Sequence, residues 1–394
     1  MSSSGFACPP ARAVVLAVLL FTPPATAVEP LPGPPSAALA DAGPDVAMPP
    51  PMYIPDPSGN AAFAGMPSSI AERMLPDWPR WFAGATGLVM TRTLPVGVAT
   101  MQPLGTTQLT TADAAATWPG GVDLHIGRWF GDRQRHAVEL VYWGVFGIGA
   151  AAATSAAPPA IDAIPQAPGA TIGGLPAASF LATAAGQEIA RSDVINDVEI
   201  NWLHAPTARP EFPLQQQRLN VIWLAGFRFF QVGDTLTLTS RPGNAALAPA
   251  VLAVATNNNL YGAQVGAKFD WRFLPTVRFD VVPKFMIAGN SITDTTSLGT
   301  AAGTPAVFPG GAPVNVHSSL GVFSWLGSVD TGIAWDVTDH WTLSIGYRVV
   351  GVGNIAQADG QWPSLIVTPG TVSGIEAGSS TIIHGGFAGF EARY

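Results

Sequence analysis

The stretch "LYGAQVGAKFDWRF", residues 260–273, decides the fold because from Tyr261 onward its apolar residues alternate with polar residues or glycine. Strict alternation predicts a β-strand with one apolar and one polar face. A tilted strand crosses a membrane with about 9–11 residues, whereas strands of soluble proteins usually have about 5–6. We therefore expect a membrane-crossing strand. Its apolar face holds Tyr261, Ala263, Val265, Ala267, Phe269, Trp271 and Phe273.

The same alternation recurs along the chain, at 219–229, 277–287, 341–349 and 386–394. The last of these, "GFAGFEARY", ends the chain on an aromatic residue, and we expect it to pair with the first strand near 81–90. Phe387 falls on its inward face, which predicts a bulge or an aromatic side chain in the lumen.

Short connections alternate with long stretches rich in Gly, Ala, Pro and Thr, which is typical of outer-membrane barrels with short periplasmic turns and long outer loops. Four short and five long connections predict ten strands and place both termini on the periplasmic side. The short connections are 131–134, 206–215, 274–276 and 337–340. The long ones are about 93–118, 148–192, 241–256, 293–319 and 356–380.

The strand count has one alternative. A further hairpin within 148–192, where "ATIGG" and "ASFLATAA" are weakly strand-like, would make twelve strands. The segment "DTLTLTS" (234–240) is interpreted instead as an extension of the fifth strand beyond the membrane.

Composition supports a membrane protein. Only 11 % of the 394 residues are charged, against about 25 % in an average soluble domain, and the mean hydropathy is +0.29. No apolar run reaches the roughly 18 residues of a membrane-spanning helix. Because only helices and closed barrels satisfy their backbone in lipid, we predict an all-β fold, a closed antiparallel transmembrane β-barrel.

The N-terminal region predicts export. Residues 1–27 have an apolar run and an A-x-A site at 25–27, which is typical of a cleaved signal peptide. Cleavage removes Cys8, the one cysteine. Residues 28–77 are rich in Pro and Ala and predict a disordered periplasmic linker, with a structured plug as the alternative. Residues 78–394 then form the barrel, located in the cell outer membrane.

Aromatic residues gather at the chain ends and short turns, where we expect the periplasmic membrane interface. The predicted interfacial girdle comprises Trp81, Trp129, Trp271, Trp335, Trp341 and Tyr394.

Four stretches carry a family resemblance: 122–147, "RLNVIWLAGFRFFQVGDTLTL" (218–238), "NNNLYGAQVGAKFDWRF" (257–273) and 329–355. In this order they resemble the strands of planctomycete-type predicted outer-membrane β-barrel proteins, the family called "beta-barrel protein seven". The resemblance covers most of 80–394, although 148–192 matches no family pattern. It implies a fold and a location, but no activity, cofactor or catalytic residue.

Inward-facing charges are the candidate site. We expect opposite charges on neighbouring strands to pair and fill a narrow lumen, which gives a structural or surface-exposed role. The alternative is a porin-like passive channel for small hydrophilic solutes; a ring of one sign, which would indicate ion selectivity, is not visible. The predicted lumen residues are Glu139, Glu199, Arg228, Lys268, Asp270, Arg278, Asp280, Lys284, Asp330, Arg348 and Glu391.

An enzyme is the third and least favoured class. The six histidines are scattered, and no metal-binding or nucleophile motif occurs, so we predict no catalytic activity, no metal and no cofactor. A rim hydrolase would have to use His317, His384, Asp193 and Asp294. The expected partners are outer-membrane lipid and, through the aromatic C-terminal strand, the outer-membrane insertion machinery. The mild acidity, a formal charge of −8, argues against nucleic acid.

Overall fold

The computed structural model describes residues 80–101, 109–131, 134–155, 161–182, 184–206 and 218–394. The predicted signal peptide and the Pro-rich linker lie outside these residues. Within the described part of the chain, no helix has the length and apolar character needed to cross a membrane.

The chain forms one closed antiparallel ring. The main sheet has 11 strands, and an additional pairing of β3 with β7 closes it while β4 stays outside the ring, so ten strands make the barrel. The predicted barrel is therefore confirmed. Its strands are β1 (Trp81–Arg92), β2 (Gly120–Phe130), β3 (His136–Ile148), β7 (Ala184–His204), β8 (Leu219–Pro242), β9 (Ala250–Leu274), β10 (Val277–Thr300), β12 (Asn315–Asp336), β13 (Trp341–Ile355) and β14 (Ser379–Arg393).

The first and last strands close the barrel. β1 pairs with β14 over a register that runs from Phe82–Arg393 to Arg92–Ile383, as predicted for the C-terminal strand. No bulge interrupts this pairing at Phe387, and its side chain lines a lumen cavity. Of the two predicted alternatives, the structure therefore shows the aromatic side chain in the lumen.

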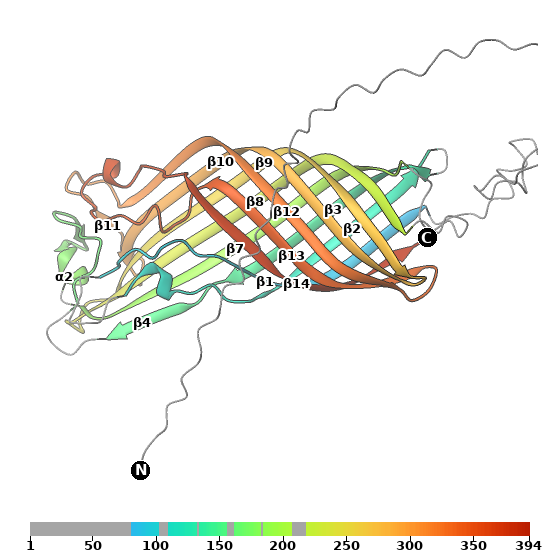
Figure 1. Ribbon diagram of the computed structural model, residues 1–394. Coiled ribbons are helices and arrows are strands. Elements are labelled where there is room, and N and C mark those ends of the chain that lie inside the picture. Colours follow the sequence, from blue (N-terminus) through green and yellow to red (C-terminus); the bar gives the residue numbers. More distant parts are fainter. Residues whose placement is uncertain (1–79, 102–108, 132–133, 156–160, 183, 207–217) are drawn as a thin grey trace, which may run out of the picture. The chain divides into compact units, whose positions relative to one another are not determined.

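The short connections 274–276 and 337–340 lie at the end of the barrel that holds the C-terminus, and α2 and β11 lie at the other end (Figure 1). We name these the inner and outer ends, because outer-membrane barrels place short turns in the periplasm.

Strands near the outer end are longer than predicted. β7 already begins at Ala184, β8 continues to Pro242, β10 continues to Thr300 and β12 begins at Asn315, so much of the expected loops 148–192, 241–256 and 293–319 is strand. The prediction was wrong there because these segments are rich in Thr, Ala and Asn. The interpretation of 234–240 as an extension of the fifth strand is confirmed.

The twelve-strand alternative is wrong. Residues 148–192 supply β4 (Ala151–Ser155), which pairs with β7, and the small strands β5 (Thr171–Ile172) and β6 (Leu175–Pro176), which form a separate sheet with β11 (Ala306–Val307). "ASFLATAA" begins as the short helix α2 (Ala178–Leu181). Two 3-10 turns, η2 (Thr111–Asp113) and η4 (Pro369–Thr371), complete the outer connections.

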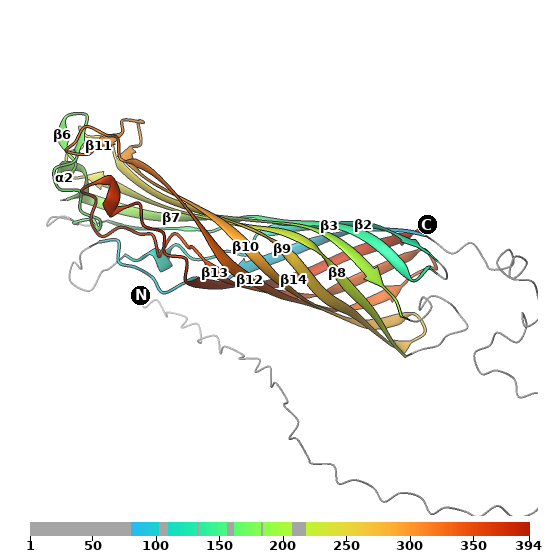
Figure 2. The same ribbon diagram turned by 90° about the horizontal axis from the view of Figure 1, so that it is seen from above.

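A large apolar core holds the outer connections together. Phe180, Leu181, Trp362 and Ile366 are buried against strand residues such as Leu238. We call this layer, made of the outer connections and the strand segments that pack against them, the outer head. Figure 2 shows it beside the outer strand ends, beyond the ring.

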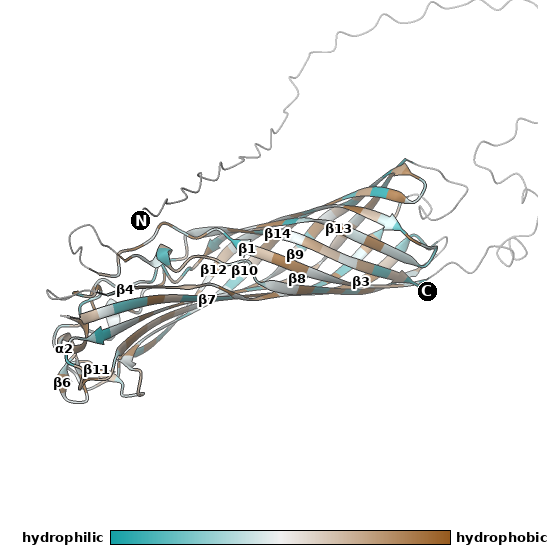
Figure 3. Ribbon diagram, turned by 90° about the horizontal axis from the view of Figure 1, so that it is seen from below, coloured by the Kyte–Doolittle hydropathy of each residue, from teal (hydrophilic) through white to brown (hydrophobic). Residues whose placement is uncertain are grey.

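The outer wall of the ring is apolar. Leu124, Trp202, Trp223, Val265 and Ile287 are all exposed on it, and apolar residues recur along the barrel strands in Figure 3. Five of the six predicted girdle residues are exposed on this wall near the inner end: Trp81, Trp271, Trp335, Trp341 and Tyr394.

Trp129 is the exception, and its assignment to the girdle was wrong. Its neighbour Phe130 is exposed, whereas Trp129 is buried and its ring lies 6.1 Å from that of Phe82. Alternation along β2 turns Trp129 inward. The prediction considered only its height in the membrane and not its face.

Candidate functional site

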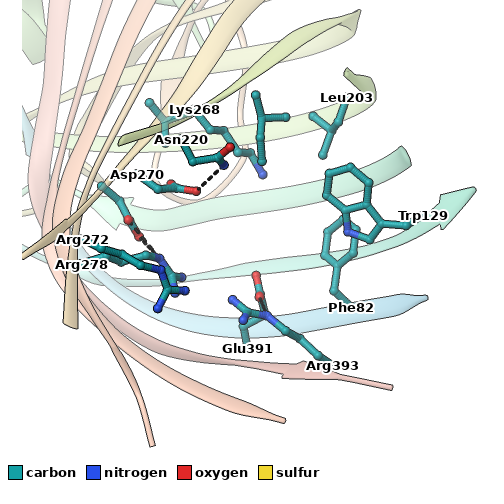
Figure 4. A pocket seen from close by; sticks show the side chains of 13 residues that line it. Phe82, Trp129, Leu203, Asn220, Lys268, Asp270, Arg272, Arg278, Glu391 and Arg393 are labelled. Carbon is teal, nitrogen blue, oxygen red and sulfur yellow. Dashed lines mark hydrogen bonds and ion pairs between the residues drawn. The ribbon is translucent and has the colours of Figure 1, made fainter. Parts of the chain in front are cut away.

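Described residues at the inner end of the lumen line two cavities. One has a volume of about 200 Å³ and is lined by Arg272, Arg278 and Arg393 among others (Figure 4). The other, of about 180 Å³, is lined by residues that include Asp123 and Arg348. Both are also lined by Lys268, Asp280, Val282 and Glu391, so we treat them as one inner vestibule.

Ion pairs surround the mouth of the vestibule. Arg278 Nη1 lies 2.8 Å from Asp336 Oδ1, and Arg278 Nε lies 3.1 Å from Asp280 Oδ1. Arg272 Nη2 lies 3.1 Å from Asp336 Oδ2. Asn220 Nδ2 donates to Asp270 Oδ2 over 3.3 Å, as Figure 4 shows. Arg278 thus has carboxylate partners on its own strand and on the neighbouring strand β12, whereas Arg272 of β9 reaches past β10 to Asp336 of β12.

Farther in, two lysines cross the lumen. Lys268 Nζ lies 2.8 Å from Glu139 Oε1, and Lys284 Nζ lies 2.8 Å from Glu199 Oε2. Asn201 and Gln264 also donate to Glu199 Oε2, over 2.9 and 2.8 Å. Because these strands are not all neighbours, the pairs fill the lumen rather than only line its wall.

Two arginines lie at the border between the charged part of the lumen and the next layer. Arg348 Nε lies 2.8 Å from Asp330 Oδ1, and Arg348 Nη2 lies 2.7 Å from Asp123 Oδ2. Arg228 is paired with Asp197. Their guanidinium carbons lie over aromatic rings, Arg348 at 5.2 Å from the Trp143 ring and Arg228 at 5.5 Å from the Phe230 ring. These rings belong to the next layer.

That layer is an apolar cluster inside the lumen, which we call the septum. All ring strands except β2 contribute to it, and most of its side chains have no accessible surface. A water-filled channel would expose some of these side chains, so the septum closes the lumen at this level. Its members are Leu88, Met90, Trp143, Val145, Ile148, Ile195, Phe230, Val232, Leu260, Met286, Ala288, Leu326, Val350, Val352, Ile355 and Ile383.

Beyond the septum lies a second set of buried charges, the outer ion-pair cluster. Arg92 lies 2.6 Å from Asp193 and 2.9 Å from Asp234. Arg191 lies 3.0 Å from Asp234 and 2.7 Å from Asp359. The Ala358 amide also donates to Asp234 over 3.1 Å. The cluster thereby fixes the segment after β13 inside the outer mouth.

The structure places all eleven predicted lumen residues in the interior, in the vestibule or in the ion pairs next to it. Sequence reasoning missed several of their partners. Asp123 and Asp197 stand at inward positions of β2 and β7, so alternation alone could have identified them. Arg92, Arg191 and Asp359 lay in segments interpreted as loops, or at their edges, and carried no such signal.

The four residues of the rim-hydrolase alternative are not brought together. Asp193 and Asp294 are buried and face inward. His317 and His384 lie on the outside, where their Nδ1 atoms are within 2.9 Å of Thr295 Oγ1 and 2.6 Å of the Tyr347 hydroxyl. Among the described residues, no group of three or more His, Cys, Asp or Glu side chains is arranged to hold a metal.

A closed ring with an apolar outer wall and a charged interior defines an integral β-barrel of the outer-membrane type. The chain belongs to the family described as "Putative beta barrel porin-7 (BBP7)", whose model matches residues 84–379. The family suggested by the resemblance is therefore confirmed.

Solved structures with a similar outline include three outer-membrane proteins. The outer membrane protease OmpT of Escherichia coli is 10 % identical, with 81 % of this chain and 98 % of that chain covered and a TM-score of 0.43. The translocator domain of the autotransporter NalP of Neisseria meningitidis is 7 % identical, with 86 % and 96 % covered and a TM-score of 0.36. A deltaS2S3 mutant of the P. putida monoaromatic hydrocarbon channel TodX is 8 % identical, with 85 % and 95 % covered and a TM-score of 0.28.

At these identities and TM-scores the three similarities add nothing to the fold that the strand register already establishes. No curated protein sequence matches the chain.

Proposed function

We propose that this protein is a sealed outer-membrane barrel with a structural role, in which the barrel anchors the outer head at the cell surface. One observation carries the proposal: the septum closes the lumen with buried apolar side chains from nearly every ring strand. A passive channel requires a continuous water path, and an apolar constriction of this kind excludes water.

The layers on both sides of the septum support the same role. Toward the inner end, carboxylates and cations are paired across the lumen at hydrogen-bonding distances. Toward the outer end, the Arg191–Asp359 pair holds the segment after β13 in the mouth. Opening a pore would separate such buried pairs, and leaving one charge of a buried pair uncompensated costs about 3–5 kcal/mol.

A passive channel for small hydrophilic solutes is the second candidate, favoured by the vestibule and by the word porin in the description of the family. In that function, the septum would have to move aside. The vestibule would then be the inner half of the pore, and Lys268 and Arg348 would contact the permeating solute.

Conductance across planar lipid bilayers distinguishes the two functions. The refolded full-length protein is expected to show no discrete, reproducible channels. Such channels, if they were lost or altered in Lys268→Glu and Arg348→Glu, would contradict the sealed barrel and establish the pore.

A pair of variants tests whether the septum is the seal. Trp143 and Phe230 are septum neighbours with ring centroids 5.8 Å apart, so Trp143→Ala with Phe230→Ala is expected to introduce a leak current. Trp202→Ala with Trp223→Ala, which removes two exposed side chains from the outer wall, is the matched control and should leave the bilayer tight. Equal conductance in both double variants would show that the septum does not seal the lumen.

The proposal includes no catalysis, and it includes export through a cleaved signal peptide and assembly by the insertion machinery. Peptidase and lipase assays on the folded barrel are expected to show no turnover. Turnover that His384→Ala abolishes would instead support the rim hydrolase.

Sequencing the N-terminus of the protein recovered from outer membranes should give Val28 as the first residue.

A further inference from the structure

Beyond the membrane section, the long strands form an open sheet rather than a ring. Its order is β4-β7-β8-β9-β10-β12. β13 pairs with β12 only from Trp325 to Asp336, whereas β10 pairs with β12 out to Asn315. Residues 315–323 of β12 therefore have a neighbouring strand on one side only, and β4 forms the opposite edge.

The hydrogen-bond pattern shows which backbone groups are free at the β12 edge. Leu298 N donates to Val314 O, so even-numbered residues of β12 bond to β10 and odd-numbered ones face away, because antiparallel strands alternate in this way. In the described part of the chain, the amides and carbonyls of His317, Ser319, Gly321 and Phe323 face no partner strand.

This edge lacks the usual protection. Natural edge strands avoid pairing with other chains by means of charged side chains, proline, bulges or a covering segment. The sequence "NVHSSLGVF" (315–323) has no formally charged residue and no proline, and its register with β10 shows no shift. Leu320 and Phe323 are 37 % and 61 % exposed. The edge is thus suited to accept an extended strand.

The opposite edge of the same sheet has matching properties. β4 reads "AAATS" and also carries no charge. Arg191 N donates to Ala150 O, so the even-numbered residues of β4 bond to β7 and the backbone groups of Ala151, Ala153 and Ser155 face away. Small side chains at such an edge leave space for a neighbouring strand.

The strand directions of β4 and β12 and their positions along the barrel axis also fit a pairing between them. Because the sheet has six antiparallel strands from β4 to β12, these two edge strands run in opposite directions. All copies of a membrane barrel have the same orientation in the membrane, so β4 of one copy is antiparallel to β12 of another. β4 pairs with residues 186–190, outward of the exposed Val194, and the free edge of β12 lies outward of the exposed Trp325. Both edges therefore lie toward the outer end from exposed apolar residues of the wall.

We propose that the outer sheets of neighbouring copies join edge to edge, with β4 of one copy antiparallel to β12 of the next. Within one copy, β13, β14, β1 and β2 separate the two edges around the ring, so the pairing must be between copies. The contact uses two different surfaces, so each copy keeps a second edge and the assembly is a ring or a row. This goes beyond the anchoring role.

Cysteine cross-linking tests the contact. The chain has one cysteine, Cys8, so the experiment uses a Cys8→Ser background. Ala153 and Ser319 are both exposed and both have free backbone groups. Copies carrying Ala153→Cys mixed with copies carrying Ser319→Cys in lipid nanodiscs or native outer membranes are expected to give an oxidant-dependent dimer band, and the double variant a ladder of multimers.

Thr237→Cys provides the matched control, because Thr237 lies in the same outer sheet but in the interior strand β8. Its mixture with Ala153→Cys should cross-link only at background level. Cross-linking of the Ala153 and Ser319 pair no stronger than this control would overturn the proposal. So would dimers that form from Ser319→Cys alone, because those indicate a symmetric contact through β12.

A proline at the edge tests the hydrogen bonding itself. Ser319→Pro removes an amide that faces away from β10, so the barrel should still assemble and keep its heat-modifiable mobility in gel electrophoresis. Association, measured as the yield of chemical cross-linking in membranes, is expected to fall at least tenfold, whereas Ser319→Thr, which keeps the amide, should associate as the unchanged chain does. Unchanged association of Ser319→Pro would contradict the edge contact.

Discussion

The inner and outer halves of β8 use the same alternation with opposite polarity. In the inner half, Trp223 and Phe227 point outward and are exposed, while Arg228 points inward and is buried. In the outer half, Thr237 points outward, and Leu236 and Leu238 are buried inside. The apolar face of this one strand therefore changes sides along its length. This is expected if the inner half is surrounded by lipid and the outer half by water. The comparison suggests four tests.

Deleting residues 390–394 should have the largest effect, because it removes the inner end of the β1–β14 pairing that closes the ring. An open edge in lipid leaves backbone groups unsatisfied, so we expect no membrane-assembled barrel. Heat-modifiable mobility on gels and protease resistance in membranes measure assembly. Deleting residues 30–60 is the control and should leave assembly unchanged; a truncated chain that still assembles would refute the role of the closure.

Asp197→Ala tests the charged interior of the inner half. It leaves Arg228, which is buried, without its closest carboxylate, and breaking a buried pair costs about 3–5 kcal/mol. Urea unfolding in lipid vesicles, followed by tryptophan fluorescence, should show this loss. Asp197→Asn keeps the side-chain volume and an acceptor and should lose less. Equal and small losses in both would mean that Glu199, 3.7 Å from Arg228, suffices.

Phe227→Arg against Thr237→Arg tests the change of solvent along one face of one strand. An arginine on the lipid face near the bilayer midplane costs about 2–4 kcal/mol, whereas a surface substitution in water usually changes stability by no more than about 0.5 kcal/mol. The same unfolding measurement compares the two. Similar losses at both positions would show that the outer half of β8 does not stand in water.

Arg241→Ala should have the smallest effect. Arg241 pairs with Glu188 at 3.0 Å, but both side chains are exposed, and exposed pairs contribute about 0–1 kcal/mol. Arg191→Ala, in the buried pair with Asp359, is the internal comparison and should cost several times more. If both cost the same, burial of the outer ion-pair cluster contributes nothing to stability.

The inner half of the barrel was predictable because alternate residues of each strand face lipid on one side and the polar lumen on the other. The lipid face at Val265 and Trp271 and the lumen face at Lys268 and Asp270 follow from one stretch of sequence. The outer half was harder. Its outward residues are small or hydroxylated, so the alternation "TLTLT" in β8 was the main strand signal there.

The closing of the lumen could not be predicted from local patterns. Septum residues such as Leu88, Trp143 and Phe230 are apolar at inward positions, and the prediction for the lumen considered only the inward-facing charges. The outer ion-pair cluster joins residues as distant as Arg92 and Asp234, or Arg191 and Asp359. Such contacts arise only when the ring closes, and they leave no periodicity in the sequence.

The vestibule, which opens at the inner end and is closed by the septum, exchanges solutes with one compartment only. If the proposed sealed barrel stands with its short turns in the periplasm, the charged lining equilibrates with the ions of that compartment. In a reconstituted, sealed membrane, a fluorescent label on Lys268 would therefore respond to ions added on the side of the inner end and not to ions added on the other side. The barrel passes through the membrane, yet this chamber samples a single side of it.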